Sequence, residues 1–153
     1  MREEEHLLNL LIEIEDRQAT QRLRTAAERL HRQRTCEGKK FLLGTVSLSQ
    51  WHGLITEAAR SQTVRGILTY LNSDKAPPWT ETTGKEIRDA LLGEIAMMRK
   101  QAEREASRIL EKVRSVVGEG KSIPSAEQIT DDLLWRWTFH YLSLVTRLKR
   151  GGA

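Results

Sequence analysis

The sequence predicts an all-α protein, a single-domain bundle of about five helices, two of them long. Proline is scarce, with three among 153 residues, and runs of β-branched residues are few, which favours helices over strands. Apolar residues also recur three and four positions apart over long stretches, as they do on one face of a helix. A chain of this length is most simply one domain, and it can bury a core without disulfides.

The first predicted element is an arginine-rich helix over residues 1–36. Its first turns combine acidic residues, which the helix dipole favours at an N-terminus, with a dense group of leucines and isoleucines. From Ala19 onward the apolar seam is thinner and arginines surround it, so we expect this half to be more exposed. Gly38 is expected to follow the helix as its C-terminal glycine.

Residues 41–73 are predicted to form short helices. The apolar run from Phe41 to Leu43 is expected to re-enter the core, and Ser47 or Ser49 caps a helix that continues to about residue 60. The next apolar residues fall almost on the opposite face, which predicts a break at 61–63 and a second short helix.

The longest helix is predicted over residues 84–117, where a capping-box pattern at Thr83 to Glu86 opens it. Gly93 lies inside this helix and costs about 1 kcal/mol relative to alanine. We therefore expect a close helix contact or a bend at Gly93.

The closing helix, residues 126–150, is the most apolar element, and a helix of this kind is buried against several neighbours. Its apolar arc covers more than half of the circumference, so we expect its four aromatic residues to lie in the core. These are Trp135, Trp137, Phe139 and Tyr141. The remaining polar stripe, which we call the open stripe, consists of Arg136, His140, Ser143, Arg147 and Arg150.

Several classes of function are not supported by the sequence. The single cysteine, Cys36, excludes an internal disulfide and fits a reducing cytosol, so a cytoplasmic location is expected. No run of about 18 uninterrupted apolar residues is present, and we expect no membrane association. The four histidines are scattered, and Glu3/His6 is a single instance of a pattern that a di-metal bundle site needs twice. No catalytic residues, cofactor or metal are therefore expected, and the protein is predicted not to be an enzyme.

The segment from Gly118 to Ser122 is similar to the end of a phosphate-binding P-loop. The full motif requires a glycine where Ser115 stands, and a strand before it where a helix is predicted. A flexible, basic loop between helices is the preferred interpretation.

Basic residues are unevenly distributed along the chain. Between Arg17 and Lys40 eight basic residues stand against two acidic ones, and no acidic residue follows Asp132. Helix C-termini are commonly basic because of the dipole, but the first cluster extends well beyond one last turn. Cations spread along a surface suit a phosphate backbone, so we expect contact with a strand of RNA or DNA. The candidate residues are Arg22, Arg29, Arg32, Lys39, Lys40, Arg60, Arg65, Arg136, Arg147 and Arg150.

Two alternative functions stay open. The basic face could meet an acidic protein, which would make the chain a helical adaptor or scaffold without nucleic-acid binding. The segment from Ile55 to Leu68 is also similar to a helix-turn-helix, with Gln62, Thr63 and Arg65 opening a recognition helix. Its turn is about two residues too short and lacks the usual glycine, which argues against a sequence-specific regulator.

The layout of the chain after about Phe41 resembles the small subunits of CRISPR effector complexes of the Cascade type. Three features carry the resemblance: the short helix at 61–71, the long charged helix, and the closing Trp-Arg-Trp-Thr-Phe-His-Tyr segment. The resemblance implies a non-catalytic subunit, present in several copies, that contacts backbone phosphates and bridges other protein subunits in antiviral defence. By that analogy Arg60 and Arg65 would contact the target or displaced strand.

Overall fold

The computed structural model describes residues 3–38, 40–73, 82–118 and 123–151. These residues form five α-helices and one 3-10 helix, and two of the α-helices contain 30 and 36 residues. The elements are α1 (Glu3–Arg32), η1 (Leu42–Thr45), α2 (Leu48–Ser61), α3 (Val64–Leu71), α4 (Thr82–Val117) and α5 (Ala126–Gly151). The described residues include no strand, only an isolated bridge between Arg34 and Phe41. The predicted all-α bundle with two long helices is confirmed.

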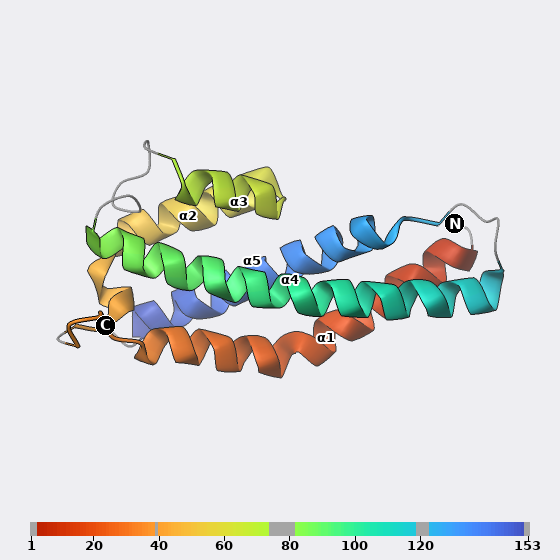
Figure 1. The fold of residues 1–153 in the computed structure, drawn as a ribbon, viewed down its shortest axis with the longest axis horizontal. Helices are drawn as coiled ribbons and strands as arrows, with labels where there is room; N and C mark the ends of the chain where they lie inside the picture. Colours follow the sequence, from red (N-terminus) through yellow and green to blue (C-terminus); the bar gives the residue numbers. More distant parts are fainter. Residues whose placement is uncertain (1–2, 39, 74–81, 119–122, 152–153) are drawn as a thin grey trace.

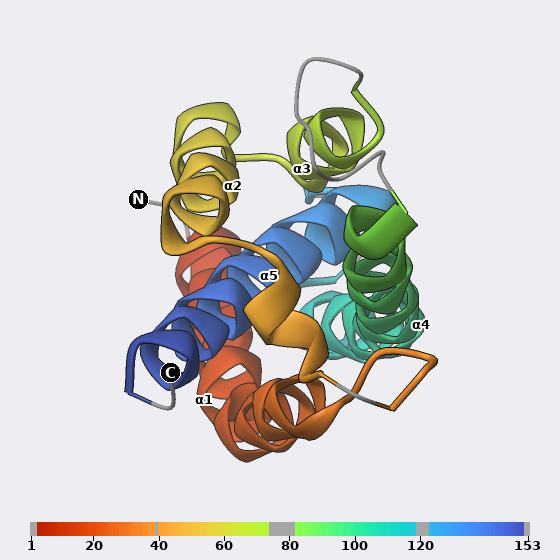
Figure 2. The same cartoon turned by 90° about the vertical axis from the view of Figure 1, so that its left-hand side faces the viewer.

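The helix α5 lies at the centre of the bundle. The long helices α1 and α4 pack against it on two sides, and the pair α2 and α3 covers a third side (Figures 1 and 2). Along the long axis, α1 and α5 run in the same direction, whereas α4 runs in the opposite direction (Figure 1). The expectation that the closing helix is buried against several neighbours is confirmed.

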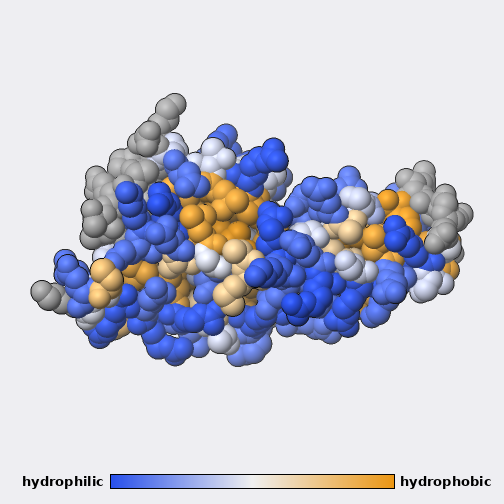
Figure 3. Space-filling model, viewed as in Figure 1, coloured by the Kyte–Doolittle hydropathy of each residue, from blue (hydrophilic) through white to orange (hydrophobic). Residues whose placement is uncertain are grey.

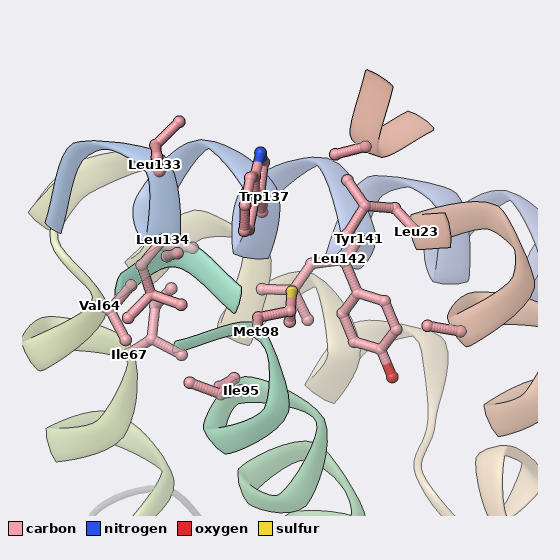
Figure 4. Packing of buried hydrophobic residues seen from close by; sticks show 14 of the residues in the cluster. Leu23, Val64, Ile67, Ile95, Met98, Leu133, Leu134, Trp137, Tyr141 and Leu142 are labelled. Carbon is pink, nitrogen blue, oxygen red and sulfur yellow. The ribbon is translucent and has the colours of Figure 1, made fainter. Parts of the chain in front are cut away.

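The aromatic residues of α5 divide into two pairs. Trp137 and Tyr141 are fully buried, and Figure 4 shows the ring of Tyr141 extending away from α5 into the core. Trp135 and Phe139 are only half-buried, and they stack on each other with ring centroids 5.3 Å apart. The core prediction is therefore correct for the first pair and only partly correct for the second, because Trp135 lines a groove beside the short helix α3.

The helices α2 and α3 form a tight antiparallel hairpin (Figure 1). Ser47, not Ser49, is the N-cap of α2, and it forms a reciprocal capping box with Gln50. At the break, Gln62 adopts a left-handed conformation with φ 54°, and Thr63 caps α3 by accepting a hydrogen bond from the Gly66 amide. The antiparallel arrangement differs from a helix-turn-helix, whose two helices cross steeply.

Residues 33–38 and 40–42 form the two arms of a short hairpin, which differs from the predicted continuation of the helix to residue 36. The amide of Thr35 donates to the carbonyl of Lys40 (2.9 Å), and Gly38 occupies the turn with φ 74° instead of following the helix. Phe41 is 50% exposed, so its placement in the core was wrong. The neighbouring Leu42 is buried, and because side chains alternate on extended backbone, Phe41 faces outward.

The close helix contact expected at Gly93 was also wrong. Gly93 is exposed on α4, and a Cβ atom added there meets no atom within 4 Å, so no close contact explains the glycine. Within the described ranges, no helix combines the length and the apolarity that crossing a bilayer requires.

Candidate nucleic-acid interface

The charges of α1 and α5 are separated along the length of each helix. Residues 3–16 contain six acidic residues and no lysine or arginine, whereas residues 17–34 contain six arginines and one glutamate. Residues 126–132 contain three acidic residues, whereas residues 133–151 contain four basic residues and none that is acidic. Because α1 and α5 run in the same direction, their basic parts meet at the end where the chain terminates (Figures 1 and 2).

We call this part of the molecule the basic end. It comprises the last residues of α5, the end of α1 and the hairpin that follows it. Its described cationic residues are Arg32, Arg34, Lys40, Arg147, Lys149 and Arg150.

Three of the predicted phosphate-binding residues are held by carboxylates of the chain itself. Arg29 donates two hydrogen bonds to Glu94 of α4 (3.0 and 2.9 Å). Arg60 pairs with Glu57 one turn away on α2, and Arg136 donates to Asp132 (2.8 Å). The hydrogen bond to Asp132 raises the pKa of Arg136, and this effect outweighs that of partial burial, which lowers the pKa. A phosphate at these three positions would have to compete with a carboxylate that is already in place.

Two further predicted residues lie outside the basic end. The guanidinium of Arg22 covers the ring of the buried Trp137, with its Cζ atom 4.8 Å from the ring centroid, so Arg22 contributes to packing. Arg65 lines a groove of about 560 Å³ between α3, α4 and the first turns of α5. Figure 3 shows apolar surface between α3 and α4 beside this groove. Acidic residues of α5 line it too, among them Glu127 and Asp131, so Arg65 is a weaker candidate for phosphate binding.

Four of the predicted residues lie at the basic end, where Figure 2 shows the end of α5 and the hairpin on opposite sides of the end of α1. Arg32, Lys40 and Arg147 are exposed and have no ion-pair partner among the described residues. Arg150 donates from Nη2 to Nε2 of His52 on α2 (2.8 Å); since arginine can only donate, this histidine nitrogen accepts. Lys39 was also predicted, but it lies outside the described residues.

One side of α1 extends the basic surface toward the open stripe of α5. The negative charges of Glu13 and Asp16 on α1 help to raise the pKa of Arg136. The side of α1 that carries these two residues therefore faces the open stripe. Helical periodicity places Arg24 and His31 on the same side as Glu13, further along α1. Arg24 is exposed, so this side of α1 is acidic near its start and basic near its end.

Lys149 has a structural role that its position in a basic run did not reveal. Its Nζ atom donates to the carbonyl of Leu43 (2.8 Å) and to that of Val46, both at η1. Burial lowers the pKa of Lys149. This residue therefore fastens η1 to α5, and the sequence offered no signal for the pairing because more than 100 residues separate the two segments.

The described residues include no group of three or more His, Cys, Asp or Glu side chains that could hold a metal ion. Exposed cations at the basic end can neutralise phosphate charge, and nothing in their arrangement reads base edges. Comparison of the chain with protein-family models, with curated proteins and with solved structures gives no match.

Proposed function

We propose that this protein is a non-catalytic subunit of a nucleoprotein complex, and that its basic end binds the phosphate backbone of RNA or DNA. The observation that supports this proposal is the shared direction of α1 and α5, which collects their basic parts at one end and their acidic parts at the other (Figure 1). A role that bridges other protein subunits, as in the CRISPR small subunits that the layout resembles, belongs to the same proposal.

The charge separation also orients the proposed complex. A strand that approaches the acidic first turns of α1 and α5 is repelled, whereas one that approaches the basic end releases counterions from its phosphates. Arg32, Lys40 and Arg147 supply charge that no described carboxylate neutralises. Binding should therefore depend strongly on salt and little on base sequence.

The experiment compares two double variants that remove equal charge. Arg32→Gln with Arg147→Gln changes the basic end, and Arg104→Gln with Arg114→Gln changes exposed positions on the second half of α4. We expect the first variant to weaken binding of a 20-nucleotide strand and to reduce the slope of log K against log salt by about 0.7–0.9 per lost phosphate contact. The second variant should bind like the wild type. Equal losses in both variants would contradict a localised site.

A protein adaptor is the second candidate, because the groove beside Trp135 is a cavity of about 560 Å³ with both apolar and charged walls. The absorbance of the purified protein separates the two functions. Co-purifying nucleic acid raises the ratio of absorbance at 260 and 280 nm, and this ratio should fall after a high-salt wash. A low ratio together with no binding at low salt would favour the adaptor.

A further inference from the structure

The hairpin at the basic end presents an aromatic ring to solvent. The side chain of Phe41 is 50% exposed, although the next two residues, Leu42 and Leu43, are buried. The guanidinium of Arg34 lies over this ring, with its Cζ atom 4.4 Å from the ring centroid. The two residues are paired across the hairpin by an isolated antiparallel bridge.

Several contacts fix the backbone of the hairpin that carries this ring. The hairpin is closed by the bond from the Thr35 amide to Lys40 and by one from the Leu42 amide to Gln33 (2.8 Å). Its turn is tied to α4, because the amide of Cys36 donates to Oε1 of Glu86 (3.1 Å). Lys149 holds the following residues through η1. The backbone that carries the ring is therefore held before a ligand binds, and stacking on the ring would cost little backbone entropy.

Its surroundings favour one kind of ligand. Exposed aromatic rings beside arginine and lysine are the parts from which single-stranded nucleic-acid sites are built, because every base has a π-face and every nucleotide a phosphate. Arg32 and Lys40 are exposed on the same segment and can meet the flanking phosphates. The bases of a duplex are stacked on each other, so they are not free to stack on a protein ring.

We propose that Phe41 and Arg34 form a stacking platform for an unpaired nucleobase, which makes single-stranded nucleic acid the ligand of the basic end. This inference rests on the proposed function and names its ligand class. It adds to the backbone contacts one contact that needs a base, and this contact does not depend on the identity of that base.

The test uses single strands with equal phosphates and different bases, together with a duplex whose bases are already stacked. The probes are a 12-nucleotide oligo-dA, an abasic strand of the same length, the corresponding oligo-rA and a 12-base-pair duplex. Wild-type protein should bind oligo-dA about 5- to 150-fold more tightly than the abasic strand, the range expected for one stacked base. The oligo-rA arm shows whether the platform distinguishes RNA from DNA. Affinity for the duplex, which carries twice as many phosphates, should not depend on the Phe41 ring.

Variants of Phe41 separate stacking from folding. Phe41→Leu should remove the preference for bases while leaving affinity for the abasic strand unchanged, and Phe41→Tyr should retain the preference. Met97→Ala, which removes a 53% exposed apolar side chain from α4, serves as the matched control and should change neither affinity. Thermal unfolding of each variant confirms that the bundle is intact.

Three results would overturn the inference in different ways. Equal wild-type affinity for oligo-dA and the abasic strand removes the platform but leaves phosphate binding intact, and points to a protein partner for Phe41. A Phe41→Leu variant that loses both affinities equally shows that the ring only supports the hairpin. Absence of binding to all four probes at low salt refutes the proposed function itself.

Discussion

Replacing Tyr141 by phenylalanine tests how the central helix is packed. Tyr141 is fully buried, and its hydroxyl has no hydrogen-bond partner among the described residues. A buried polar group without a partner costs about 1–3 kcal/mol, because its bonds to water are lost on folding and are not replaced. The Tyr141→Phe variant should therefore be more stable than the wild type by about 1–3 kcal/mol at pH 7.

The Tyr141→Phe substitution should also change how the stability of the protein depends on pH above pH 9. Burial raises the pKa of Tyr141 far above its usual value of 10, with a smaller contribution from Glu94. Above pH 10 the unfolded chain loses the phenolic proton while the folded chain keeps it, so stability falls as pH rises. This contribution amounts to about 1.4 kcal/mol between pH 9 and pH 11 and is absent in the variant.

Urea unfolding at pH 7, 9 and 11 measures both effects. Lys149, whose lowered pKa acts in the opposite direction at alkaline pH, is present in both proteins, so its contribution cancels in their difference. Tyr70→Phe on the half-exposed side of α3 is the control and should stay within about 0.5 kcal/mol of the wild type at pH 7. A variant of Tyr141 that is less stable at pH 7, or a difference that does not widen toward pH 11, would refute the reasoning.

Two further substitutions test the local packing by chemical denaturation. Gly93→Ala should stabilise the protein by up to about 1 kcal/mol because the exposed helix gains propensity and the new Cβ meets nothing within 4 Å. Gly66→Ala should instead destabilise it by about 1–3 kcal/mol, because its Cβ would lie 2.4 Å from that of Ser61; equal effects at the two glycines would contradict this account. Lys149→Met keeps the length of the side chain but leaves two carbonyls at η1 without their donor, so a loss of roughly 1–3 kcal/mol is expected. An unchanged urea midpoint would show that Lys149 does not fasten η1.

The helices were predictable from the sequence because their signals are local. Apolar spacing, a capping serine before α2 and the phase change before Val64 each act within a few residues, and the structure follows them. The prediction failed just after α1, which ends at Arg32, where a hairpin takes the place of the last predicted turn of the helix. Phe41 is apolar and next to two leucines, yet the hairpin bridge to Arg34 turns it outward.

The candidate site was predictable only in part, because its contacts join residues that are distant in the sequence. Composition identifies which segments are basic, but it does not identify which arginines are already paired. Arg29 is joined to Glu94 across 65 residues of sequence, and Arg22 to Trp137 across more than 100. Arg32 and Arg147 have no such partner among the described residues, and only the packing of α1 beside α5 places them at one end.

The affinity of the wild-type protein for a single-stranded oligonucleotide, measured at several salt concentrations, tests most directly whether this is a nucleic-acid-binding protein. We expect binding at low salt, with log K falling linearly with log salt and a slope of about 0.7 for each phosphate that the basic end neutralises. Absence of binding at low salt, or an affinity that does not change with salt, would contradict phosphate recognition by the basic end.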